Sequence, residues 1–208
     1  MIKPSPSSEV INALPNIQHK KYLELGIDGG STFLHVRSEH KVGVDIEPKI
    51  KHPNVLTMTT DDFFKKYPMK FDIIYIDACH SFESVVADYN NAVIALNKGG
   101  IILVHDLVPA SEEDCKYDNV GSGTGYKFLL YLVMHCPWCL GNVDVCSENH
   151  GLTIFSDPKH VHINEYVSHH SLTYHLLQQY IERNMVNMHS HKNLCLIAET
   201  INGTITSW

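Results

Sequence analysis

The chain has 208 residues, of which 44% are hydrophobic, and its formal net charge is −7 with the 15 histidines neutral. A chain of this length can bury a full core as one domain, and it holds no apolar run of membrane-spanning length. Because it also lacks a basic run and an apolar signal segment, we expect a soluble cytoplasmic protein with mostly reduced cysteines and no nucleic-acid partner.

The N-terminal part of the chain predicts a strand followed directly by a glycine-rich loop. Residues 1–8 are polar and contain prolines, so we expect them to be flexible, and a short helix is predicted at 9–14. The predicted strand at 20–24 leads into Leu25-Gly26-Ile27-Asp28-Gly29-Gly30, and a helix is predicted at 31–36. Glycines between a strand and a helix let backbone amides approach a ligand closely.

Two further strands are predicted after this loop. The strand at 41–45 ends in Asp45, and an acid at this position commonly binds the ribose hydroxyls of an adenosine group. The strand at 55–58 leads into a helix that Thr59 should cap, with Asp61 in its first turn.

The centre of the chain predicts a strand, a helix and a parallel strand. The apolar run at 73–76 is typical of a strand that is buried on both faces. Ser81 is the expected N-cap of the helix, and the glycine pair at 99–100 is expected to end it. A second buried strand at 101–104 completes a βαβ unit with a right-handed crossover.

Polar side chains follow both of these strands where each one ends. Asp77 and His80 follow the first strand, and His105 and Asp106 follow the second. Neighbouring parallel strands lie about 4.8 Å apart and bind ligands beyond their carboxyl ends, so the four side chains should face one another. Such a cluster suits a divalent cation or acid–base catalysis, and simple capping by Asp77 or a satisfied strand-end His105 stays open as an alternative.

The C-terminal half carries weaker patterns. The loop at 108–125 is rich in glycine, serine and acids, and it is the expected mobile lid. The final residues from 193 onward are β-prone. The remaining predicted elements are a helix at 126–135, a hairpin of strands at 143–146 and 152–155, and an amphipathic helix within 171–188.

The sequence Cys136-Pro137-Trp138-Cys139 suggests either a redox pair or half of a zinc site, with Cys146 and His150 as further ligands. However, the spacing matches no common zinc motif. The pair also closes the helix at 126–135, whereas a redox pair opens a helix. A structural role is the favoured interpretation.

The glycine loop favours a cationic ligand over a pyrophosphate. Dinucleotide-binding loops follow the pattern GxGxxG, whereas Asp28 stands here at the second glycine and Glu24 lies two residues before the first. Negative side chains repel a pyrophosphate but suit the cationic amino end of S-adenosylmethionine. An NAD-dependent oxidoreductase is disfavoured on the same ground.

At these positions the sequence resembles the class I S-adenosylmethionine-dependent methyltransferases. YLELGIDGGST and VGVDIEP resemble their first two motifs, and FDIIYIDACHSFESVVADYNNAVIALNKGGIILVHDLVP is similar to small members related to sugar and catechol-type O-methyltransferases. The resemblance implies a Rossmann-like, doubly wound α/β fold with a mostly parallel seven-stranded sheet and helices on both faces. It implies one domain over 1–208, with a lead-in at 1–15 and a C-terminal helical or irregular extension at 158–208.

The resemblance also implies roles for matching residues. The donor would contact Glu24, Gly26, Gly30 and Ser31 at its methionine end, Asp45 at its ribose, Thr60 and Asp61 near its adenine, and Asp77. The catechol-type relatives hold a divalent cation after their fourth and fifth strands, which implies Asp77, His105 and Asp106 as metal ligands here. Because histidine is softer than Mg²⁺ prefers, Mn²⁺ is an alternative and metal dependence stays open.

The implied reaction is methylation of a small hydroxyl-bearing acceptor such as a sugar, with His80 and His105 as catalytic bases. A cation at Asp77 and Asp106 would lower the pKa of the acceptor hydroxyl. Two alternatives stay open: a non-catalytic S-adenosylmethionine-binding module, and a methyltransferase that acts on nitrogen or on nucleic acid. A homodimer is compatible with the sequence.

Overall fold

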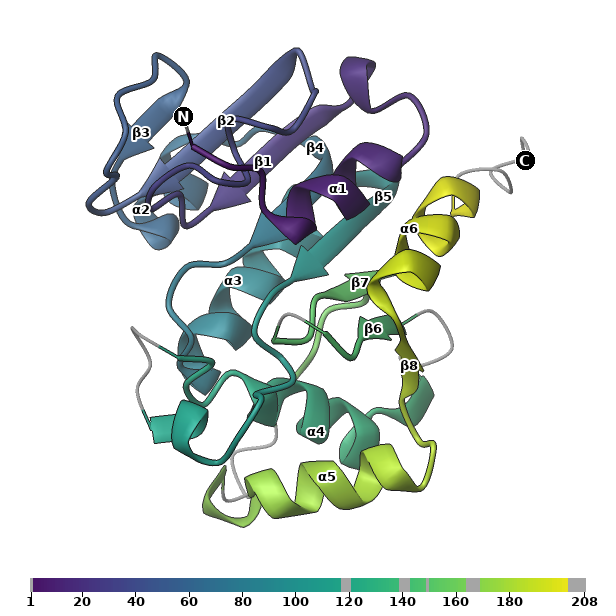
Figure 1. Ribbon diagram of the computed structural model, residues 1–208. Helices are drawn as coiled ribbons and strands as arrows, with labels where there is room; N and C mark the ends of the chain where they lie inside the picture. Colours follow the sequence, from purple (N-terminus) through teal and green to yellow (C-terminus); the bar gives the residue numbers. More distant parts are fainter. Residues whose placement is uncertain (1, 117–120, 139–142, 149, 164–168, 202–208) are drawn as a thin grey trace.

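The computed structural model describes residues 2–116, 121–138, 143–148, 150–163 and 169–201. These residues form an open sheet with helices on both faces (Figure 1). The strands are β1 Lys21–Leu25, β2 His40–Asp45, β3 Val55–Thr57, β4 Phe71–Ile76, β5 Leu96–Val104, β6 Val143–Cys146, β7 Thr153–Phe155 and β8 Asn187–His189. The α-helices are α1 Pro6–Ala13, α2 Thr60–Lys66, α3 Phe82–Ala95, α4 Tyr126–His135, α5 Tyr174–Glu182 and α6 His191–Thr200.

The strands lie in the order β3-β2-β1-β4-β5-β7-β6-β8. Strands β1 to β5 are parallel, whereas β7 is antiparallel to both β5 and β6. The prediction of a doubly wound, mostly parallel sheet is confirmed, with β8 as an additional strand beside β6. The strand order reverses between β1 and β4, and open α/β sheets bind their ligands at such a point.

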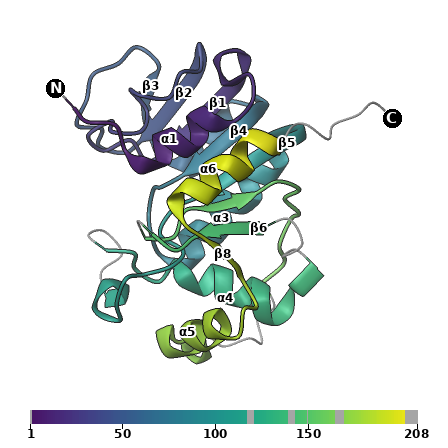
Figure 2. The same cartoon turned by 45° about the vertical axis from the view of Figure 1, so that its right-hand side comes forward.

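Alternating side chains of the central strands pack into two cores, one on each face of the sheet. On one face, Ile74 and Ile76 pack with the apolar residues of α3, α4 and α5. On the other face, Ile73 and Tyr75 pack with those of α1 and α6, which lie together across the sheet (Figure 2). No helix in the described part of the chain combines the length and the apolar character that a membrane crossing needs.

Several local predictions are confirmed. Thr59 caps α2 by accepting from the Asp62 amide at 3.1 Å, and Ser81 caps α3 by accepting from the Ser84 amide at 3.3 Å. Helix α4 has the predicted bounds, and β6 and β7 pair as the predicted hairpin.

Two predictions around the glycines are wrong. Residues 31–35 form hydrogen-bonded turns in place of a helix. Helix α3 ends at Ala95, and the glycine pair at 99–100 lies inside β5. A Cβ at Gly100 would lie 2.9 Å from the Asp72 carbonyl oxygen, so this glycine serves close strand packing and not a helix cap.

The ends of the chain are more regular than predicted. The lead-in is ordered, since Ser5 caps α1 and Ser7 is buried. The helix expected within 171–188 stops at Glu182, and Asn184 then takes a left-handed conformation (φ 54°) before β8. Residues 193–200 of the β-prone C-terminal segment instead belong to α6, because burial against α1 overrides local β propensity.

Candidate functional site

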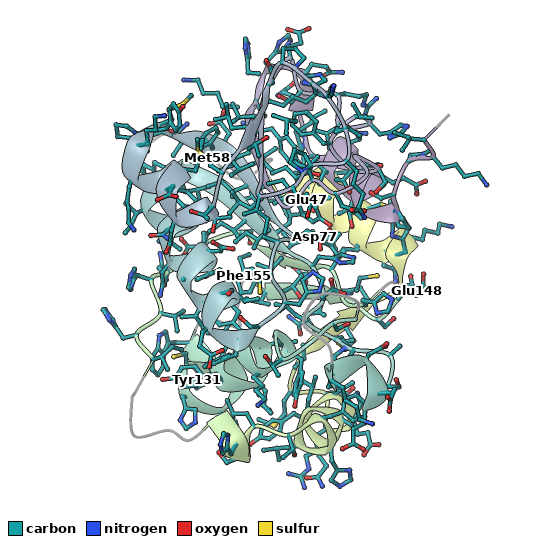
Figure 3. The ribbon with its side chains drawn as sticks, turned by 90° about the vertical axis from the view of Figure 1, so that its left-hand side faces the viewer. Glu47, Met58, Asp77, Tyr131, Glu148 and Phe155 are labelled. Atoms are coloured by element: carbon teal, nitrogen blue, oxygen red, sulfur yellow. The ribbon has the colours of Figure 1, made fainter. Side chains whose placement is uncertain are left out.

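A cavity of about 280 Å³ opens beyond the carboxyl ends of β2 and β4. Its walls come from the glycine loop, the ends of these two strands and the first turns of α2 and α3. Gly26, Asp45, Thr60 and Asp77 line it, which brings together four of the residues predicted to bind the donor. Figure 3 shows Asp77 at the middle of the molecule, with Met58 of the same cavity above it.

Gly26 determines how closely the loop approaches β4. Its φ is +87°, and a Cβ built on it would lie only 2.0 Å from the Asp77 carbonyl oxygen. Its amide donates to the Val44 carbonyl oxygen at 2.9 Å, which continues the β1–β2 pairing into the loop. A side chain would therefore push the loop away from both strands.

Asp45 holds the glycine loop from the end of β2. Its carboxylate accepts from the amides of Ile27 at 2.7 Å, Asp28 at 2.9 Å and Glu47 at 2.7 Å. A carboxylate offers about four acceptor positions, so capacity remains for a hydroxyl in the cavity. Lys49 forms an ion pair with Asp28, which also lines the cavity.

The four ionisable residues after β4 and β5 meet next to this cavity. His80 Nε2 lies 3.5 Å from Asp77 Oδ1 and 3.2 Å from Asp106 Oδ2. His105 Nδ1 lies 3.4 Å from Asp77 Oδ1 and 3.0 Å from Asp106 Oδ2. Each imidazole thus faces both carboxylates, as the positions of the residues at neighbouring strand ends predicted.

Residues 23–107, which contain the glycine loop and this cluster, match the model of a family described as a methyltransferase domain. This match agrees with the resemblance of the sequence to the class I S-adenosylmethionine-dependent methyltransferases. We found no match to the chain among curated proteins.

Solved structures share the fold of this chain at low sequence identity. Cofactor-bound Rv0187 from MTB is 17% identical, with a TM-score of 0.53 over 76% of this chain and 83% of that one. An O-methyltransferase from Bacillus cereus in complex with SAH is 18% identical (TM-score 0.50; 74% and 81% covered). The O-methyltransferase TomG from Streptomyces achromogenes in complex with SAM is 15% identical (TM-score 0.51; 74% and 80%).

The other residues predicted to bind the donor lie around the cavity of Gly26 and Asp45 without lining it. Glu24 is buried within β1, where the Tyr22 hydroxyl donates to it at 2.5 Å and burial raises its pKa. Gly30 and Ser31 lie further along the loop, and Asp61 faces Asn91 at 3.4 Å. Glu24 therefore supports the loop from the core side.

The charges of the cluster depend on one another. Burial lowers the pKa of His80, but the hydrogen bond to Asp77 and the charge of Asp106 outweigh this effect and raise the pKa to about 9. Burial likewise opposes charge on His105, yet Asp77 and Asp106 raise its pKa well above the usual value. Burial raises the pKa of Asp77, while His105 and His80 outweigh it and hold that pKa low.

Three of these residues have the geometry of a metal site. The ligand atoms of Asp77, His80 and Asp106 all lie within 4.8 Å of one another. His80 Nδ1 donates to the Gly121 carbonyl oxygen at 2.7 Å, so Nε2 is the ring nitrogen that faces the two carboxylates. The set fits a divalent cation that accepts nitrogen and oxygen ligands, with His80 in the place predicted for His105.

Sequence reasoning missed two contributors to the site. Asp88 of α3 lines the cavity, is 3% exposed, and has its pKa raised to about 6 by burial. It lies one turn after Ser84, so its helical spacing was a usable signal. Ser122 donates to Asp106 Oδ1 at 3.2 Å, and no pattern in its loop indicates this contact.

The cysteines do not form the zinc set that was considered. Cys136 packs in the core on the α3 face of the sheet, whereas Cys146 packs on the α1 face. His150 Nδ1 lies 3.3 Å from Ser122 Oγ, next to the ionisable cluster. Cys139 lies outside the described residues.

Proposed function

We propose that this methyltransferase transfers a methyl group from S-adenosylmethionine to the hydroxyl oxygen of a small acceptor such as a sugar. The observation that carries the proposal is the cluster of Asp77, His80, His105 and Asp106 beside the cavity of Gly26 and Asp45. An alcohol is a poor nucleophile until its proton is removed, and this cluster supplies bases where the transferred methyl group would lie.

In this proposal the cavity binds the donor. Asp45 accepts from the ribose hydroxyls, and the tight approach of Gly26 to β4 places the loop beside the methionine portion. Thr60 and Asp88 line the part of the cavity assigned to the adenine. Asp77 borders both the cavity and the cluster, so it places the sulfonium near the acceptor.

The reaction breaks the bond between sulfur and methyl carbon, forms a bond from the same carbon to the acceptor oxygen, and moves the hydroxyl proton to a base. Asp77, His80 and Asp106 are the residues that would hold a divalent cation. When bound, such a cation lowers the pKa of an acceptor hydroxyl. His105, the imidazole outside that group, would accept the proton in its neutral form; the two carboxylates raise its pKa, and the positive charge of the cation would oppose them.

Methyl transfer from labelled S-adenosylmethionine to a panel of hydroxyl acceptors tests the proposal, with EDTA and with added Mg²⁺ or Mn²⁺. We expect the wild type to transfer the methyl group to oxygen, and we expect Asp106→Asn to lose this activity. Asp144→Asn is the matched control, because Asp144 also pairs with a histidine, His189 at 2.9 Å, away from the cavity. Transfer to nitrogen acceptors alone, or equal activity of Asp106→Asn and wild type, would contradict the proposal.

A further inference from the structure

A second cavity, of about 430 Å³, lies where the end of α4 meets residues 160–162. It is lined by Tyr131, His135, Cys136, Trp138, His160 and His162, together with Val161. Figure 3 shows Tyr131 well apart from Asp77, so this cavity is separate from the donor site. The proposed methylation gives no role to three histidines at this position.

The segment that carries two of these histidines is held rigidly. Asn90 of α3 accepts from the Val161 amide at 2.9 Å and donates to the Val161 carbonyl oxygen at 2.9 Å. Val161 itself is 3% exposed, so its side chain points into the core. His160 and His162, on either side of Val161, are exposed, and their ring centroids are 4.7 Å apart.

The third histidine faces them with an unsatisfied nitrogen. His135 Nε2 is buried and has no hydrogen-bond partner among the described residues. The His135 ring packs against Tyr131 with centroids 4.8 Å apart, and the Tyr131 hydroxyl donates to the His162 carbonyl oxygen at 3.1 Å. A buried polar nitrogen without a partner is unfavourable, and a bound ligand at this position would remove the penalty.

We propose that His135, His160 and His162 form a binding site for a transition-metal ion, best suited to Zn²⁺. Three neutral imidazoles suit Zn²⁺ and do not suit Mg²⁺ or Ca²⁺, which prefer oxygen ligands. The ligand atoms of Asp77, His80 and Asp106 all lie within 4.8 Å of one another, and this is the group of such closely placed ligands among the described residues. The ring nitrogens of the three histidines are further apart than this. The exposed rings of His160 and His162 therefore rotate on binding, and the ion then links α4 to the segment at 160–162.

Calorimetric titration of Zn²⁺ into the full chain tests the site, in an Asp106→Asn background that disables the cluster beside the donor cavity. We expect binding that raises the melting temperature and that weakens at least about tenfold in His160→Ala and in His162→Ala. Both residues are exposed, so these variants should fold. His19→Ala, with a side chain 77% exposed elsewhere on the surface, is the matched control and should bind like its parent. Equal affinity in all four proteins, or no binding in the parent, would overturn the proposal.

Discussion

The donor cavity and the ionisable cluster adjoin at Asp77, yet they are built in different ways. The cavity depends on backbone geometry, since Gly26 has no room for a Cβ and three backbone amides converge on Asp45. The cluster depends on side chains, since two imidazoles and two carboxylates compensate one another in a partly buried position. A larger side chain in the glycine loop should therefore weaken donor binding and lower the free energy of unfolding. Removal of a charge from the cluster should instead lower the rate of methyl transfer first.

The largest effect expected is on the reaction. Asp106→Asn removes the carboxylate that both His80 and His105 face, and it keeps the shape of the side chain. We expect methyl transfer to fall by about a thousandfold, within the usual range for loss of acid–base catalysis. Steady-state rates at saturating donor measure it, with Asp144→Asn expected to retain wild-type rates.

A steric change should affect the cavity more than the cluster. In Gly26→Ala the new methyl group would meet the Asp77 carbonyl oxygen, and alanine disfavours a φ of +87°. We expect a loss of about 3 kcal/mol in the free energy of unfolding, together with loss of S-adenosylmethionine binding. Urea unfolding measures the first effect.

Gly29→Ala is the matched control for this change, because a Cβ at Gly29 meets nothing within 4 Å. Its free energy of unfolding should stay within about 0.5 kcal/mol of wild type. Equal destabilisation by the two substitutions would show that the close approach of the loop to β4 is unimportant.

Asp88, in the wall of the cavity, should make the free energy of unfolding depend on pH. Burial raises its pKa from 3.8 to about 6, so the folded state binds a proton more tightly than the unfolded state. Its contribution to stability is therefore fully present below pH 3.8 and is lost as the pH rises toward 6. Asp88→Asn should be more stable than wild type at pH 7, by roughly 2–3 kcal/mol, and should lose this advantage near pH 4.

Urea unfolding at several pH values tests this prediction. Asp62→Asn, which changes an exposed acid in the first turn of α2, is the control and should show no comparable gain. If the difference in free energy of unfolding between Asp88→Asn and wild type is the same at pH 4 and pH 7, the raised pKa of Asp88 is not its cause.

The smallest effect should come from the contact between the cavity and the N-terminal helix. The Tyr75 hydroxyl lies 2.8 Å from Asp77 Oδ2 and 3.2 Å from Ser7 Oγ. Tyr75→Phe should lower the free energy of unfolding by about 1 kcal/mol, as expected for one buried hydrogen bond. An unchanged unfolding midpoint would show that the hydroxyl contributes nothing to the fold.

The sequence predicted the first five strands because those elements have local signals, and four of the eight residues predicted to bind the donor line the cavity. The apolar run at 73–76 and the cap at Ser81 each act through neighbouring residues. In contrast, β8 requires β6 as its partner, and α6 requires burial against α1, so neither can be recognised from its own residues. The contact of His80 Nδ1 with the Gly121 carbonyl oxygen likewise depends on a loop that is distant in the sequence.

Calorimetric titration of S-adenosylmethionine into wild type, Asp45→Asn and Asp106→Asn tests most directly whether the cavity binds the donor independently of the cluster. The structure predicts that Asp45→Asn weakens binding at least about tenfold, because an NH2 donor replaces one of the two oxygens that accept from backbone amides, while Asp106→Asn stays within about threefold of wild type. Unchanged binding in Asp45→Asn, or an equal loss in both variants, would contradict the assignment of donor binding to the cavity of Gly26 and Asp45.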